Sequence, residues 1–145
     1  MARMGRFDPT PLIEFQRKLE KINQDKMDAF LEDCTKELAA RLLRLVIKRT
    51  PKGEYPKSTG KKGGTLQRGW TYTDNMAIRH EGNNYIIEIV NPVEYASYVE
   101  YGHRKANHKG WVEGEFMMTI SENELRTIAP KVLENKLKKF LGGVI

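Results

Sequence analysis

Three histidines are the side chains best suited to catalysis or metal binding. His80 precedes a predicted turn, and His103 and His108 lie five residues apart in a basic segment. Metal ligands usually occur at helical or tight-turn spacing, with carboxylates or thiolates nearby. The neighbours here are lysine and arginine, which repel a cation, and nothing fixes the geometry of Glu113. We expect solvated loop histidines, and a metal-dependent hydrolase built on His103, His108 and Glu113 is kept only as a third hypothesis.

Motifs for nucleophilic or phosphate chemistry are missing from the sequence. It contains no Gly-x-Ser-x-Gly nucleophile motif. The glycine-rich run Gly60–Thr65 lacks the four-residue spacing of a phosphate-binding loop, and it is predicted to precede a strand instead of a helix. Cys34, the single cysteine, lies on the apolar stripe of a predicted helix, so we expect it to be a buried small hydrophobic residue. The chain is therefore predicted to have no enzymatic activity and no cofactor.

Two consecutive amphipathic helices are predicted between residues 11 and 49. The first has one apolar stripe over three turns, formed by Leu12, Phe15, Leu19 and Ile22. The register slips at Asn23-Gln24-Asp25, where an asparagine or aspartate can cap a new helix. The second stripe runs from Met27 to Val46, and Thr50-Pro51 ends the helix.

Residues 70–91 are predicted to form a β-hairpin. Large apolar side chains alternate through the first strand, and Glu81-Gly82-Asn83-Asn84 supplies the turn. The returning strand is rich in β-branched residues and ends at Asn91-Pro92. Because two strands alone are marginal in water, the long helix must cover one face. We also expect strands from a neighbouring chain or another segment to pair along an edge.

A short helix and a long C-terminal helix are predicted after the hairpin. Residues 93–101 place tyrosines at helical steps, and Gly102 is suited to end that helix. Residues from about 113 to 141 have an apolar face with helical periodicity. Ser121 and Glu124 have the spacing of a capping box.

Two basic loops are predicted, in a chain whose net charge is +6 from 25 basic and 19 acidic residues. A mobile loop at about 51–68 is too polar to offset its ordering entropy, and a second loop is expected at 102–112. Eight of their cations are candidate contacts to DNA or to a protein partner: Lys52, Lys57, Lys61, Lys62, Arg68, Arg104, Lys105 and Lys109. A small nucleic-acid-binding module that uses these loops is therefore the alternative hypothesis, with salt-dependent attraction and no sequence readout.

Together these elements predict a single α+β domain over residues 1–145. Its parts are a long N-terminal amphipathic helix, a small antiparallel β-sheet built on a hairpin, a short aromatic helix and a C-terminal helix. Apolar residues make up 39% and charged residues 30%, enough for a thin core beside a large wet surface. No stretch approaches the roughly 20 apolar residues that span a bilayer, so no membrane partner is expected.

Two short motifs carry a resemblance to a known family. The helix that ends at Thr50-Pro51 is followed, after a gap, by Gly64-Thr65-Leu66-Gln67-Arg68-Gly69-Trp70. Downstream, Asn91-Pro92 leads into Tyr95-Ala96-Ser97-Tyr98-Val99-Glu100-Tyr101-Gly102. In this order they resemble the tailed-phage minor tail component and tail-completion, or head-tail joining, protein family of the lambdoid tail-component type. Gly69 stands where that family has serine, a difference we expect to matter little.

The resemblance implies a structural protein of the virion, located in the neck or tail and made in the host bacterial cytoplasm. It implies a hexameric ring between head-connector and tail-tube proteins, with a monomer in isolation left open. No catalytic residue comes with the family. The motif residues expected to serve packing are Thr50, Pro51, Leu66, Trp70, Tyr95, Tyr98 and Gly102. Function is then expected in the loops and at the sheet edges.

Overall fold

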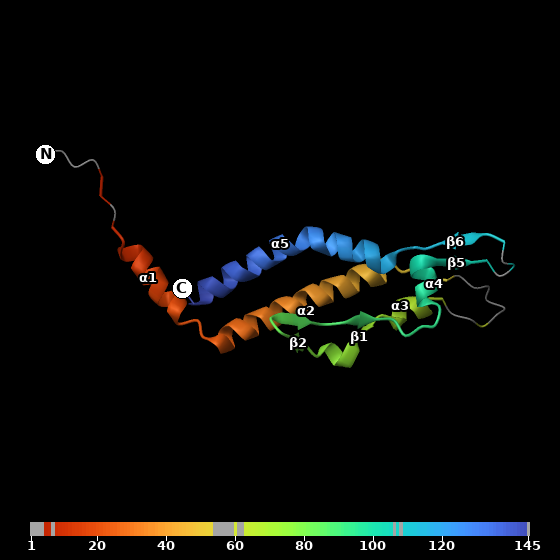
Figure 1. Ribbon diagram of the computed structural model, residues 1–145, viewed down its shortest axis with the longest axis horizontal. Coiled ribbons are helices and arrows are strands. Elements are labelled where there is room, and N and C mark those ends of the chain that lie inside the picture. The colour runs from red at the N-terminus through yellow and green to blue at the C-terminus, as the bar shows by residue number, and fades with distance from the viewer. Residues whose placement is uncertain are drawn as a thin grey trace.

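The computed structural model describes residues 5–6, 8–53, 60, 63–105, 107 and 109–144. The chain forms an elongated rod in which two long helices, α2 (Gln24–Arg49) and α5 (Met117–Val144), lie side by side and antiparallel (Figure 1). Short strands and helices lie along α2 and at the end where α2 finishes and α5 begins. The mixed helix-and-sheet class predicted from the sequence is confirmed.

The predicted break between the two N-terminal helices is also confirmed. α1 (Thr10–Glu20) ends before the slip in register, and none of its residues is buried. The Asn23 side chain then caps α2 by accepting a hydrogen bond from the Lys26 backbone N–H at 2.9 Å. At the other end, Thr50 leaves the helical conformation with ψ 125°. Pro51, which is exposed, follows directly, so the Thr-Pro step stops the helix as expected.

The hairpin is built from two short antiparallel ribbons. Their strands are β1 (Thr71–Tyr72) with β4 (Ile89–Val90), and β2 (Arg79–Glu81) with β3 (Asn84–Ile86). The predicted turn at Gly82-Asn83 is confirmed. The continuous first strand is wrong, because a 3₁₀ turn, η2 (Thr73–Met76), interrupts it and holds Asn75 and Met76 at positive φ of 56° and 69°. Alternating apolar residues did not reveal this local turn.

Both basic segments contain more regular structure than predicted. In the first, α3 (Thr65–Gly69) occupies the end of the expected loop, while residues 54–59 and 61–62 lie outside the described part of the chain. In the second, β5 (Gly102–Arg104) pairs with β6 (Trp111–Glu113), so the range expected as a loop begins and ends in strands. The polar composition of this segment predicted a loop, but its backbone forms strand pairs. Main-chain hydrogen bonds need no apolar side chains, so composition does not exclude them.

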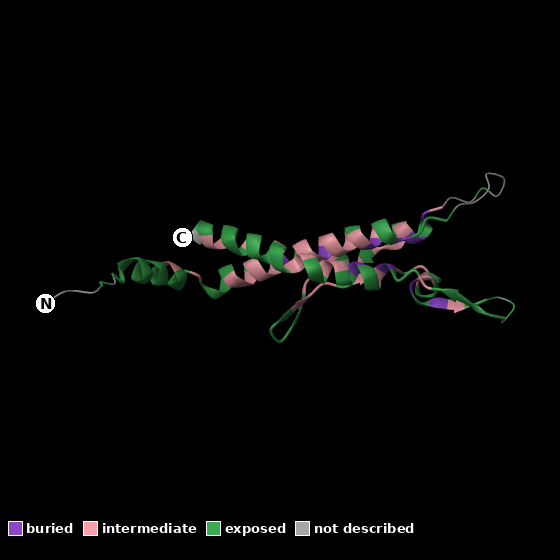
Figure 2. Cartoon of the chain, turned by 90° about the horizontal axis from the view of Figure 1, so that it is seen from above, coloured by how far each residue is buried: buried purple, intermediate pink, exposed green. Residues whose placement is uncertain are grey.

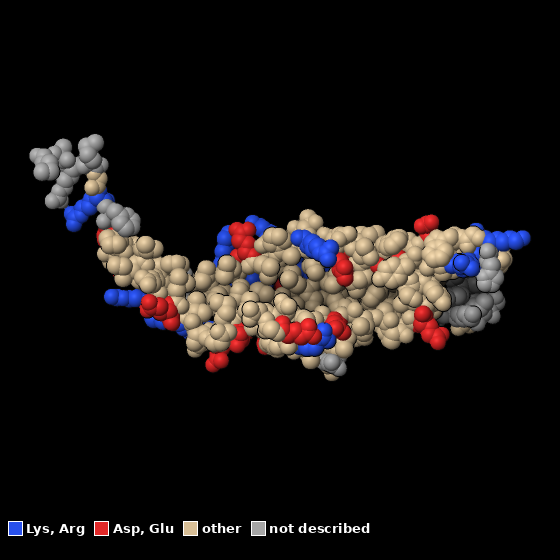
Figure 3. All heavy atoms as spheres, viewed as in Figure 1, with Lys and Arg blue, Asp and Glu red and all other residues tan. Residues whose placement is uncertain are grey.

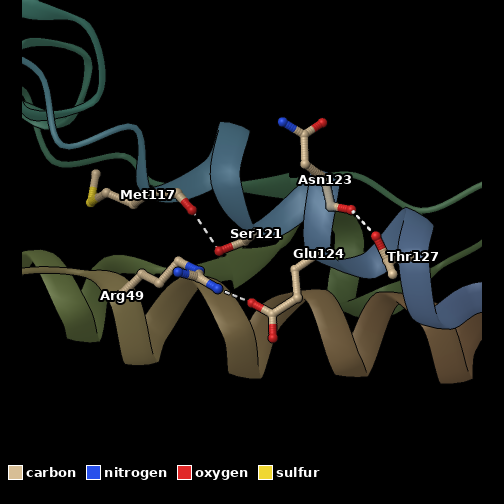
Figure 4. A network of polar contacts seen from close by, with 6 residues as sticks. All are labelled: Arg49, Met117, Ser121, Asn123, Glu124 and Thr127. Carbon is tan, nitrogen blue, oxygen red and sulfur yellow. Dashed lines mark hydrogen bonds and ion pairs between the residues drawn. The ribbon is translucent and has the colours of Figure 1, made fainter.

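Polar contacts near the start of α5 join it to α2 (Figure 4). Arg49 of α2 forms an ion pair with Glu124, and Ser121 donates to the carbonyl of Met117 at 2.5 Å inside the helix. The capping box expected at Ser121 and Glu124 is therefore wrong, because α5 starts four residues earlier, at Met117. Among the described residues, no helix is long and apolar enough to cross a membrane.

The core is thin and lies at one end of the rod (Figure 2). Val46, Leu66 and Met117 are its buried centre, from α2, α3 and α5. Partly buried side chains surround them: Leu43, Trp70, Val93, Ala96, Val99 and Met118. Farther along the pair of long helices, burial is lower, and Phe30 stacks on Phe140 with ring centroids 4.4 Å apart.

Candidate functional site

The first sequence motif fastens the end of α2 to the segment that enters the hairpin. The Trp70 indole N–H donates to the Thr50 hydroxyl at 2.6 Å, and that hydroxyl donates to the Val46 carbonyl at 2.5 Å. The Gln67 side-chain amide donates to the Thr50 carbonyl at 3.1 Å. Thr50 and Leu66 are 3% and 4% exposed. These hydrogen bonds position the chain where it leaves α2.

The difference at Gly69 has a structural reason. The Asn91 side chain donates to the Leu66 carbonyl at 2.8 Å and accepts from the Val93 N–H at 3.1 Å. A Cβ atom on Gly69 would lie 2.3 Å from the Asn91 Oδ1 atom and 2.8 Å from a Val93 methyl group. The expectation that this difference matters little is therefore not supported, because Asn91 is held in place from two sides.

Gly69→Ala should lower the free energy of unfolding by about 1–3 kcal/mol, the usual effect of overpacking. Urea unfolding followed by circular dichroism measures it. Gly142→Ala is a matched control, because a Cβ atom there meets nothing within 4 Å. Equal stability of the two variants would contradict the assigned contact with Asn91.

The second motif supplies a cap for α5 from another helix. Glu100, in α4 (Ala96–Tyr101), is only 7% exposed. One carboxylate oxygen accepts from the Met118 N–H at 2.9 Å, and the other accepts from the Thr119 N–H at 2.9 Å and its hydroxyl at 2.7 Å. The first N–H groups of a helix have no partners within it, and the helix dipole favours a negative charge there. Glu100 thus fixes where α5 begins.

The motif tyrosines do not form the packing face that was expected. Tyr95, Tyr98 and Tyr101 are 42%, 59% and 64% exposed, whereas the side of α4 that faces the core carries Ala96 and Val99. Gly102 ends α4 with φ 89° and is buried. The exposed tyrosines therefore belong to the surface.

Glu100, Gln67 and Asn91 are the positioning residues that the sequence reading missed. All three lie inside the two motifs, so the motif pattern itself was the available signal. Hydrophobic periodicity could not reveal Glu100, because the amides that it caps belong to a helix that is distant in the sequence.

The β2–β3 ribbon is attached to α2 by polar contacts. The Tyr85 hydroxyl donates to the Asp28 carboxylate at 2.7 Å, and His80 lies 3.4 Å from Glu32. The hydrogen bond from Tyr85 lowers the pKa of Asp28, and the same bond raises the pKa of Tyr85. The ionised form of Asp28 is therefore the one that holds the ribbon.

We expect acid to release this ribbon. Because the folded pKa of Asp28 lies below its ordinary value of 3.8, the stabilisation is complete above pH 3.8 and falls as the pH drops through the folded pKa. The protection of the β2 and β3 amides, meaning their slowing relative to the intrinsic exchange rate at the same pH, should fall in that range. In Tyr85→Phe this protection should be low already at neutral pH. Tyr98→Phe, at an exposed tyrosine, is the control. Unchanged exchange in Tyr85→Phe would refute the assigned role.

The α1 stripe and an apolar groove beside α2 are both uncovered in the described part of the chain. The α1 stripe consists of Leu12, Phe15 and Leu19, which are 62%, 38% and 37% exposed. The apolar groove, of about 650 Å³, lies between α2, α5 and residues 83–89, a segment that includes β3 and is called the β3 arm. Its main walls are Leu31, Leu38, Leu42, Ile87, Leu125 and Leu133. Cys34 forms part of its floor, and burial raises the pKa of that thiol, in agreement with the predicted packing role.

The candidate cations that the structure describes come together at the core end of the rod. We call Lys52, Arg104, Lys105 and Lys109 the basic end; Figure 3 shows Lys and Arg side chains there. Arg68 lies nearby but is engaged, since it donates to the Gly63 carbonyl at 3.0 Å. The other candidates, Lys57, Lys61 and Lys62, lie outside the described residues.

The structure does not bring His103 and Glu113 together with a third metal ligand among the described residues. The His103 ring lies 5.7 Å from the ring of Tyr98, and its Nδ1 atom lies 3.0 Å from the Arg104 carbonyl oxygen. The register places Glu113 opposite Gly102, and His108 is outside the described residues. Within the described ranges, no group of three His, Cys, Asp or Glu side chains could hold a metal ion.

Comparison with known proteins agrees with the motifs. The family model described as bacteriophage HK97-gp10, a tail component, matches residues 13–102, which include both motifs and most of α1. No curated protein and no solved structure matched the chain. The matched region covers more than half of the sequence and contains the residues that fasten α2, α3 and α4 together. The chain therefore belongs to the HK97-gp10-like family of phage tail components.

Proposed function

We propose that this tail component completes the tail at the neck, where copies form a ring and dock between the head-connector and tail-tube proteins. The observation that carries the proposal is the amount of uncovered surface. The chain exposes 11247 Å², whereas a compact protein of 16.8 kDa exposes about 7,700 Å². The difference of about 3,500 Å² on one chain exceeds the roughly 800 Å² that each partner contributes to a standard interface, so it is enough for contacts with more than one neighbour.

The character of that surface supports the same proposal. Among the described residues, fourteen large apolar side chains are exposed, against five buried apolar residues. Uncovered apolar surface of this kind marks protein interfaces. The exposed tyrosines of α4 and Trp111 of β6 lie at the core end, and the α1 stripe lies at the other end (Figure 1). A rod with apolar surface at both ends is suited to contact different neighbours at once.

The experiment removes the protein from the phage or prophage that encodes it. Negative-stain electron microscopy of the lysate should then show filled heads and separate tails, and purified protein added to the lysate should restore joined, infectious particles. Complete particles in the deletion strain would refute a role in tail completion. A lysate with no tails at all would instead indicate a role in building the tail tube.

A second candidate function, contact with DNA, is favoured by the basic end. Lys52, from the segment after α2, and three cations of the β5–β6 ribbon lie at the same end of the rod (Figure 1). In a ring, such an end can face DNA as it passes. Attraction of this kind acts on the phosphate backbone and weakens steeply with salt.

Charge reversal of the basic end tests this candidate. Lys52→Glu, Lys105→Glu and Lys109→Glu together should weaken binding of duplex DNA at low salt by roughly 10-fold or more. The matched control is Lys26→Glu, Lys36→Glu and Lys138→Glu, which changes the net charge equally on other exposed positions. Fluorescence anisotropy with a labelled duplex measures both. Equal loss in the two triple variants would show that only net charge matters.

A further inference from the structure

We infer that the α1 helix of one copy binds in the apolar groove of a second copy, between its α2, β3 arm and α5. This inference rests on the ring in the proposed function and specifies the contact that builds it. Both surfaces are present on every chain, and neither is covered in the described part of it. A helix with an apolar stripe placed in an apolar groove is a recurrent mode of protein recognition.

The two surfaces match in length. At 1.5 Å per residue, the 11 residues of α1 span about 16 Å. On the α2 wall, the distance from Leu31 to Leu42 along the helix is also about 16 Å. Leu12, Phe15 and Leu19 lie on one face of α1, at steps of three and four residues, so all three can enter the groove together.

Charge selects an antiparallel orientation of α1 on α2. The last turn of α1 is basic, with Arg17 and Lys18. Along α2, Asp28 and Glu32 lie within one turn of Leu31, whereas Arg41 and Arg44 lie within one turn of Leu42. An antiparallel helix places its basic turn beside the carboxylates. A parallel helix would place the same turn beside the arginines, which repel it.

The connection to α2 favours a second copy over the helix's own chain. Only Lys21, Ile22 and Asn23 separate α1 from α2, and the Asn23 cap holds its backbone extended with ψ 173°. Figures 1 and 2 show α1 directed away from the paired helices. The groove of its own chain begins at Leu31, which lies about two turns after the start of α2. To reach it, α1 would have to fold back along α2. The helix is thus presented outward.

Such a contact is head-to-tail and therefore propagates. Each chain gives its α1 to one neighbour and receives α1 from another, which closes into a ring when the rotation between copies allows it. The contact also covers Leu133, which is 36% exposed on the α5 wall.

Complementing variants test this inference by sedimentation velocity over a wide range of concentrations. The helix variant carries Leu12→Glu with Leu19→Glu, on side chains that are not buried. The groove variant carries Leu133→Glu, and Leu38→Glu on the opposite wall provides an independent second one. Lys36→Glu is the control for the helix variant, because it changes the net charge by the same two units on an exposed position of α2. Circular dichroism confirms that each variant is folded.

The wild type and the control should self-associate, and each interface variant should associate roughly 100-fold more weakly, because a charge would be buried without a partner. An equimolar mixture of helix and groove variants should form dimers and nothing larger, since it retains one intact helix and one intact groove. A wild type that stays monomeric throughout, or a mixture that stays monomeric, would overturn the inference. The first result is the one expected if α1 packs on its own chain.

Addition to the deletion lysate separates this inference from the proposed function. If wild-type protein restores infectious particles and the helix variant does not, both stand. If both restore particles, the interface is wrong and the role in tail completion stands. If wild-type protein restores nothing, the role in tail completion fails, whatever the sedimentation shows.

Discussion

Glu100→Ala should lower the free energy of unfolding by about 3 kcal/mol and leave the start of α5 frayed. The substitution removes an acceptor of three hydrogen bonds and leaves the Met118 and Thr119 N–H groups without partners. It also removes a negative charge from the positive end of the helix dipole. Urea unfolding measures the loss of stability, and amide exchange at Met118 and Thr119 shows whether it originates at this helix end.

Glu100→Gln separates hydrogen bonding from side-chain volume. Glutamine has nearly the same shape, but its NH₂ group must face one of the helix N–H donors, so it should retain only part of the stability. Glu94→Ala and Glu94→Gln, at an exposed glutamate before α4, are the matched controls and should change stability by less than about 0.5 kcal/mol. If Glu100→Gln and Glu94→Gln were equally stable, the carboxylate would not be the cap.

The helices were predictable from the sequence because their signals are local. The α1 stripe has helical spacing, the cap at Asn23 lies beside the slip in register, and Thr50-Pro51 stops α2 within a single step. Each of these signals needs only neighbouring residues. The turn at Gly82-Asn83 is local in the same way.

The misses depend on partners that are distant in the sequence. The start of α5 is fixed by Glu100, 18 and 19 residues before the amides that it caps, so the local Ser121 pattern gave the wrong boundary. Pairing of β5 with β6 depends on the backbone, which composition does not report. The tyrosines of α4 have helical spacing, but spacing alone does not say which face of a six-residue helix meets the core.

The candidate surfaces divide in the same way. The α1 stripe is visible in the sequence, whereas the groove needs α2, the β3 arm and α5 to be placed together. The basic end is likewise a product of the fold, since Lys52 and Lys105 are far apart in the sequence. The sequence therefore predicted one half of the proposed interface between copies, and the structure supplied the other.

Trp70→Ala should cause the second large loss of stability, about 3–5 kcal/mol. The indole packs on the buried cluster of Val46, Leu66 and Met117, and its N–H donates to the hydroxyl of Thr50. Among the described residues, this cluster is the only one that joins α2, α3 and α5. No other apolar contact there can therefore compensate for the loss of the indole. A loss of this size approaches the whole stability of a small domain.

Thermal unfolding followed by circular dichroism measures the effect, and Trp111→Ala is the matched control. Trp111 is 55% exposed on β6, so the same truncation there should change the Tm by only a few degrees. Trp70→Phe keeps most of the apolar contact and removes the hydrogen bond, so it should lose about 1–2 kcal/mol. If Trp70→Phe were as damaging as Trp70→Ala, the hydrogen bond to Thr50 would dominate over packing. Equal effects at Trp70 and Trp111 would instead mean that the core lies elsewhere.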